Sequence, residues 1–103
     1  MDLIAEKLIG KELREIQHKA KYDTMIIFED GSITAWTDVK VSISFGDDPV
    51  IVRDVVWSGE WFTILFNEGE IRVSRIPTST NPECFIYGSI GQPTLMIVDR
   101  GEE

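Results

Sequence analysis

The chain contains one histidine, His18, and one cysteine, Cys84. A nucleophilic serine, threonine or cysteine needs an activating base, and that base is usually a histidine. His18 stands among charged residues, as a solvated surface histidine does. Cys84 opens an apolar stretch, as a small buried hydrophobe does. Folding could bring the two together, but nothing in the sequence calls for such a pair. We therefore expect a protein that is not an enzyme.

Carboxylate pairs are the next candidates for chemistry. Asp47 and Asp48 stand in "GDDP", and Glu29 with Asp30 flanks a predicted hairpin tip, so a calcium site or an acid–base pair is conceivable. Turn chemistry explains these residues more simply, because aspartate stabilises chain reversals. One histidine and one cysteine cannot supply the clustered ligands of a zinc site, and no phosphate-binding glycine motif occurs. We expect no metal and no cofactor.

The charge of the chain is strongly and unevenly negative. Ten Lys and Arg residues stand against eighteen Asp and Glu, for a formal net charge of −8. Residues 1–21 hold five basic and four acidic side chains, and residues 22–103 hold five basic and fourteen acidic ones. Such a surface repels nucleic acid and attracts a basic protein surface. We expect a basic protein partner and no direct nucleic-acid binding, although acidity could also serve solubility alone.

Two tryptophans flank a predicted turn. A two-residue turn at Ser58 and Gly59 would place Trp57 opposite Glu60, with Trp61 next along the strand. Large aromatic side chains beside acidic ones resemble the anchors of protein interfaces. They could equally close one end of the core. The predicted interface consists of Trp57, Trp61, Glu60, Asp47, Asp48 and Asp54.

A second reading is a ligand pocket inside a barrel or between protomers. Arg53, Arg72 and Arg75 would bind an anion there, and Trp36 or Trp61 would form a stacking wall. Arg72 projects from the less apolar face of its predicted hairpin, where a pocket or a subunit contact would lie.

A hairpin pattern occurs twice, as "MIIFEDGSITAW" in residues 25–36 and "TILFNEGEIRVS" in residues 63–74. Asp30-Gly31 and Glu68-Gly69 predict tight turns with positive φ, so that Phe28 faces Ile33 across the first hairpin. Each hairpin would be apolar on one face, and that face would have to pack against the other hairpin or against a common core. The predicted inward residues are Ile26, Phe28, Ile33 and Ala35 in the first copy, and Phe62, Ile64, Phe66, Ile71 and Val73 in the second.

The remaining elements complete a mainly β fold. A short helix should end near Gly10, and residues 11–21 fit a helix or a strand, with strand favoured. Residues 39–45 alternate, which predicts Val39, Val41, Ile43 and Phe45 facing inward. We predict a single domain, residues 1–103, with a short N-terminal helix and six or seven antiparallel strands in a small sandwich or barrel.

These features favour one function over another. The start lacks the pattern of a secretory signal, no apolar run approaches the roughly 20 residues needed to cross a bilayer, and Cys84 has no disulfide partner in the chain. A cytoplasmic location without membrane association is expected. The favoured function is a small acidic, non-enzymatic binding protein that blocks a basic surface, as an immunity protein or a phage-type inhibitor does. The alternative is a small-molecule or nucleotide-binding β domain with a pocket inside the barrel or between the protomers of a homo-oligomer.

Overall fold

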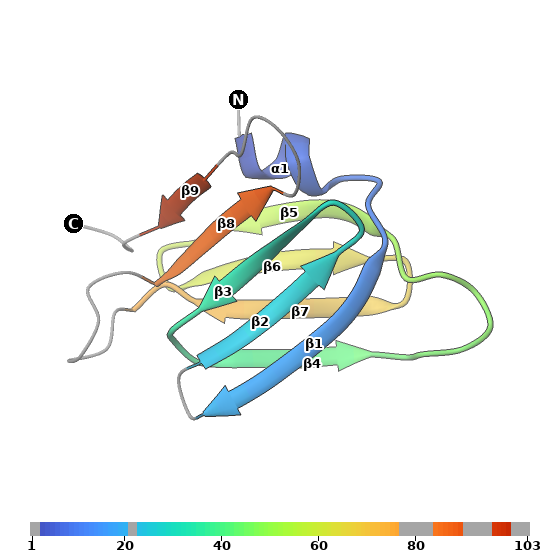
Figure 1. Cartoon of the computed structure of the whole chain (residues 1–103), viewed down its shortest axis with the longest axis horizontal. Helices are drawn as coiled ribbons and strands as arrows, with labels where there is room; N and C mark the ends of the chain where they lie inside the picture. Colours follow the sequence, from blue (N-terminus) through green and yellow to red (C-terminus); the bar gives the residue numbers. More distant parts are fainter. Residues whose placement is uncertain (1–2, 21–22, 77–83, 90–95, 100–103) are drawn as a thin grey trace.

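The computed structural model describes residues 3–20, 23–76, 84–89 and 96–99. They form two antiparallel sheets that lie face to face, with their strands crossing at an angle (Figure 1). One sheet has five strands in the order β1-β2-β3-β8-β9, and the other has four in the order β4-β7-β6-β5. The elements are α1 Leu3–Leu8, β1 Leu13–Ala20, β2 Asp23–Phe28, β3 Gly31–Ala35, β4 Val39–Ile43, β5 Val52–Trp57, β6 Trp61–Phe66, β7 Gly69–Ser74, β8 Phe85–Ser89 and β9 Met96–Asp99.

A mainly β fold with a short N-terminal helix is confirmed, and it is a sandwich. The described residues form nine strands, more than the six or seven expected, and residues 13–20 and two short C-terminal segments join the sheet of the first hairpin. Within the described ranges, no helix has the length and apolar character to span a bilayer.

The two hairpins bury their apolar faces against each other, as predicted. Alternate residues of β2, β3, β6 and β7 point inward and are almost fully buried. The rings of Phe28 and Phe66 stack between the sheets with centroids 6.5 Å apart. Each hairpin alone would expose this face to water, so the pairing of the two layers supplies the hydrophobic driving force of the fold.

The turns of the two hairpins differ from the prediction. Phe28 pairs with Gly31 and Phe66 with Gly69, so the turn residues are Glu29-Asp30 and Asn67-Glu68, and Ile33 faces Ile26 rather than Phe28. The register is shifted by two positions, an even number, so every side chain stays on its predicted face.

The two glycines serve strand packing instead of the turns. A Cβ at Gly31 would lie 2.6 Å from Tyr87 Oη, and a Cβ at Gly69 would collide with the carbonyl oxygen of Ser42. Only Gly69 has the positive φ expected of both, at +141°. Each glycine therefore lets a neighbouring strand, β8 or β4, approach closely.

The N-terminal segment closes one edge of the four-stranded sheet. Ile4 and Leu8 are buried, and Gly10 ends the helix with a φ of +87°. The chain then runs beside the start of β5, where Gly10 N donates to Val52 O at 2.9 Å and Leu13 N donates to Val50 O at 2.8 Å. Beyond this link, residues 13–20 form strand β1. Of the helix and strand that the sequence allows for this segment, strand was the favoured prediction.

The opposite edge of that sheet, β4, is less covered than predicted. Val41 pairs with Ile71 and so lies on the inner face, yet 45% of it is exposed. Phe45 follows the end of the strand and is 69% exposed. Val41 thus has the predicted direction without being covered, and Phe45 does not enter the core. The physical reason is that β1 crosses β4 instead of running along it (Figure 1).

Candidate functional site

Trp57 and Trp61 lie on opposite faces of the four-stranded sheet. Trp57 pairs with Phe62 and shares its inner face, and its ring lies 4.4 Å from that of Phe62 and 6.0 Å from that of Phe85. Trp57 thus closes one end of the core and remains 36% exposed. Trp61 pairs with Ser74 and projects from the outer face. The two tryptophans do not form one patch.

The turn between them also differs from the prediction. Ser58 N donates to Trp61 O at 2.8 Å, and the Ser58 hydroxyl accepts from Trp61 N at 3.0 Å. Gly59 and Glu60 therefore form the turn, and Phe62, not Glu60, lies opposite Trp57. Glu60 sits exposed at the tip, and the serine side chain bonds the backbone of Trp61 directly after it.

Basic side chains gather around the two tryptophans. Lys40 Nζ lies 5.1 Å from the Trp61 ring centroid and Arg72 Cζ lies 4.9 Å from it. Arg75 Cζ lies 4.9 Å from the Trp57 ring centroid, and its Nη1 donates to Ser58 O at 2.7 Å. Cations over aromatic faces are favourable. We call these five residues the tryptophan end.

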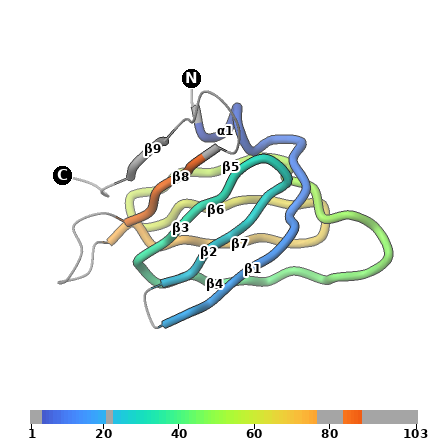
Figure 2. The backbone as a smooth tube through the Cα atoms, viewed as in Figure 1, coloured from blue at the N-terminus to red at the C-terminus, as the bar shows by residue number. Residues whose placement is uncertain are grey.

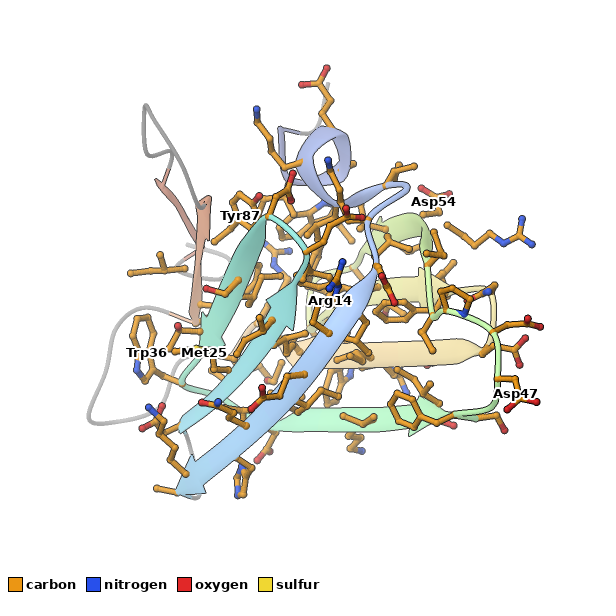
Figure 3. The ribbon with its side chains drawn as sticks, turned by 45° about the vertical axis from the view of Figure 1, so that its right-hand side comes forward. Arg14, Met25, Trp36, Asp47, Asp54 and Tyr87 are labelled. Atoms are coloured by element: carbon orange, nitrogen blue, oxygen red, sulfur yellow. The ribbon has the colours of Figure 1, made fainter. Side chains whose placement is uncertain are left out.

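The opposite end of β6 and β7 carries acidic side chains. Asp47 and Asp48 stand in the β4–β5 loop, which reaches beyond the strand ends (Figures 2 and 3). Glu68 in the β6–β7 turn lies beside this loop, because Ser44 N donates to Glu68 O at 2.9 Å. Together with Ser44, Phe45 and Gly46 these three acidic residues line a hollow of about 120 Å³. We call Asp47, Asp48 and Glu68 the acidic end.

Asn67 holds the acidic end in place. Its side-chain Oδ1 accepts from Ile51 N at 2.9 Å and its Nδ2 donates to Pro49 O at 3.0 Å. Its backbone N also donates to Ile51 O at 3.1 Å. A turn residue of one hairpin therefore braces the loop that carries Asp47 and Asp48.

The acidic end lacks neutralising cations. The ion pairs among the described residues join Lys11 to Asp30 at 2.7 Å, Arg14 to Glu12 at 3.2 Å and Arg72 to Glu70 at 3.7 Å. None of them involves Asp47, Asp48 or Glu68. Across the described ranges, no three potential ligands are close enough to hold a metal ion. The acidic end is thus a patch of negative charge at the surface.

The six residues of the predicted interface are only partly brought together. Asp47 and Asp48 lie at the acidic end, whereas Trp57, Trp61 and Glu60 lie around the turn at the other end of β6. Asp54 projects from β5 apart from Asp47 (Figure 3), and its Oδ1 accepts from Val55 N at 2.8 Å.

The residues of the predicted ligand pocket lie apart as well. Arg53 falls at a register shift in β5, and Arg72 and Arg75 cover different tryptophans. Trp36 follows β3 in the other sheet, near Met25 (Figure 3), and its N donates to Cys84 O at 2.9 Å. These four residues do not line one cavity.

Glu68 and Phe45 are the site residues that sequence reasoning missed. The sequence predicts Glu68 as a turn residue and Phe45 as an inward-facing residue. Glu68 could be placed at this site only by knowing that β4 pairs with β7, because that pairing brings the turn after β6 and the loop after β4 to the same end of the sheet. That pairing joins residues about thirty apart and has no local sequence signature.

No known protein family, curated protein or solved structure matches this chain. What the protein does must therefore be inferred from its own surface.

Proposed function

We propose that the protein is a small acidic binding protein that covers a basic surface on a partner protein, and that the acidic end makes the contact. The observation that carries this proposal is the gathering of Asp47, Asp48 and Glu68 around one hollow, outside every ion pair of the described residues. Charges without a partner are the ones available to another molecule.

The distribution of cations supports the same choice of surface. Lys40, Arg72 and Arg75 lie over the tryptophans, toward the other end of the sheet, so cations accompany the acidic Glu60 there. A basic partner is therefore attracted more strongly to the acidic end, which orients the encounter. A hollow of about 120 Å³ has room for the head of one lysine or arginine side chain.

The class of activity that follows is inhibition by coverage. An immunity protein or a phage-type inhibitor works in this way, by occupying a basic functional surface without chemistry of its own. The net charge of −8 speeds the approach of such a partner, and the effect weakens as salt shortens the Debye length from about 10 Å at 0.1 M.

The test uses affinity capture from a lysate of the source organism, with bound proteins identified by mass spectrometry. Wild-type protein should retain a basic protein whose binding falls steeply as salt rises. The triple variant Asp47→Asn, Asp48→Asn, Glu68→Gln should lose most of that binding.

The matched control neutralises three carboxylates elsewhere, Glu6→Gln, Asp23→Asn and Glu60→Gln. Both variants change the net charge by the same amount, so only the position of the charges differs. Equal loss of binding in the two variants would show a non-specific charge effect, and capture of no basic protein would refute the proposal.

A further inference from the structure

Strand β4 is an edge strand that no other described strand pairs with on its outer side. Natural edge strands usually carry charges, prolines or bulges that discourage pairing with another chain. β4 pairs with β7 in regular register from Val39 to Ile43, without a bulge. Its one charged residue is Lys40, whose ammonium group leans over the Trp61 ring. The other edge of this sheet, by contrast, is covered by the link between α1 and β1.

The free backbone groups of β4 follow from its pairing with β7. Ser74 N donates to Asp38 O at 2.8 Å and Ser44 N donates to Glu68 O at 2.9 Å. In an antiparallel pair the hydrogen-bonded positions alternate, so the even-numbered residues of β4 bond to β7. The N–H and C=O groups of Val39, Val41 and Ile43 therefore point toward the open edge, and their side chains face inward.

Strand β1 overhangs this edge. It crosses β4 and continues past it in the other sheet (Figure 1). Beneath the overhang lies a hollow of about 290 Å³, lined by Ile16, His18, Thr24, Val39 and Val41. The space beside β4 is therefore covered on one face by β1 of the five-stranded sheet and lies next to the edge of the four-stranded sheet. A further strand could add to the four-stranded sheet in this space.

We propose that a second copy of this chain fills this place, so that the β4 strands of two copies pair antiparallel about a two-fold axis and Phe45 of each copy enters the hollow of the other. Phe45 is 69% exposed and stands two residues beyond the strand that would pair. An isologous contact needs a self-complementary surface. An exposed phenylalanine just past one end of β4 and a hollow over Val39 and Val41 provide one.

The register that pairs the whole strand is centred on Val41. It places Val41 opposite Val41 of the second copy and Val39 opposite Ile43, all of them residues whose backbone groups point to the open edge. On the outer face Lys40 meets Ser42, so no like charges lie directly opposite each other.

Charge favours the same arrangement. Antiparallel pairing brings the acidic end of one copy close to the start of β4 in the other copy. The exposed Lys19, near the end of the overhanging strand β1, lies on that side and attracts the carboxylates. Three carboxylates at each end outnumber that one lysine, so both ends of the joined sheet stay acidic. The dimer does not depend on the proposed function and would present that surface twice.

Sedimentation equilibrium tests the proposal on the full chain, from about 1 µM to about 1 mM. Wild-type protein should shift from monomer to dimer with concentration. Val41→Pro should weaken the dimer about tenfold or more, because it removes an N–H on the two-fold axis and spares the bonds to β7. Proline is tolerated where a strand N–H faces outward. Val41→Lys should also weaken the dimer, and it provides the same test if the proline variant fails to fold.

Val56→Lys is the matched control, because Val56 is 48% exposed but lies on the outer face of β5. It should dimerise like the wild type. A wild type that stays monomeric throughout, a dimer that survives both Val41 variants, or an equal loss in Val56→Lys would each overturn the proposal.

The register has its own test. Opposed residues of a hydrogen-bonded antiparallel pair have Cα atoms about 5.5 Å apart, within disulfide range. Val41→Cys should therefore form a covalent dimer under mild oxidation. Val56→Cys should not, and equal cross-linking of the two variants would overturn the two-fold pairing of β4.

Discussion

The hydroxyl of Tyr87 occupies the space that any side chain at position 31 would need. A Cβ on Gly31 would lie 2.6 Å from Tyr87 Oη and 2.9 Å from the carbonyl oxygen of Gly88. Tyr87 is itself buried in the core, so neither the ring nor the backbone of β8 can move aside cheaply. The β2–β3 hairpin can therefore join β8 only with glycine at its first β3 position.

Gly31→Ala should accordingly lower the free energy of unfolding by about 1–3 kcal/mol. Urea denaturation of the variant and the wild type measures the difference. Gly46→Ala is the matched control, because no atom lies within 4 Å of a Cβ at that position. Equal stability of the two variants would contradict the close packing of β3 against β8.

Phe62→Ala should destabilise the fold by about 3–5 kcal/mol. Phe62 is fully buried, stacks on Phe85 with ring centroids 4.9 Å apart and contacts the tilted ring of Trp57 at 4.4 Å, so its removal leaves a cavity between the sheets. Phe45→Ala makes the same chemical change at an exposed site and should stay within about 0.5 kcal/mol of the wild type. Both are measured by urea denaturation at low protein concentration, and a Phe45 variant as unstable as the Phe62 variant would place Phe45 in the core.

Thr37→Val should cost about 1–3 kcal/mol. The buried Thr37 hydroxyl donates to Ser74 O at 2.6 Å, tying the β3–β4 connection to the end of β7, and valine keeps the shape but not the donor. Thr63→Val on the outer face of β6 is the control. Thermal unfolding of the three proteins should rank Thr37→Val lowest, and a neutral effect there would show that the bond contributes nothing net.

Stability should fall as the pH rises above about 10. Burial and then the neighbouring Asp30 carboxylate raise the pKa of Tyr87, and the hydrogen bond and charge of Asp30 raise the pKa of Lys11. For both groups the native state holds its proton to higher pH than the unfolded chain does. Their stabilising contribution is therefore complete below the unfolded pKa and is lost as the pH rises through the folded one.

Tyr87→Phe separates the two contributions. The free energy of unfolding of this variant is measured by urea denaturation from about pH 8 to about pH 11. Above about pH 10 it should fall less steeply with pH than that of the wild type. The remaining slope belongs partly to Lys11 and should shrink further in the double variant with Lys11→Gln. An unchanged slope in Tyr87→Phe would show that the phenol titrates alike in both states.

The alternation of apolar and polar residues was enough to predict which face of each hairpin forms the core. Ile26, Phe28, Ile64 and Phe66 are buried as their spacing indicates, because the side-chain period of a strand is two wherever the strand pairs. Even the two-position shift at both turns leaves this result unchanged. The strand character of residues 13–20 was also the favoured prediction.

Only the tertiary structure decided which ends, edges and faces meet. The pairing of β4 with β7 sets Glu68 beside the β4–β5 loop, and the crossing of β1 over β4 leaves Val41 and Phe45 exposed. The turn falls at Gly59 and Glu60 rather than at Ser58 and Gly59, so Phe62 and not Glu60 lies opposite Trp57. A strand's alternation is local and can be read along the chain, whereas strand order and sheet crossing depend on contacts between distant residues that compete with one another as the whole core forms.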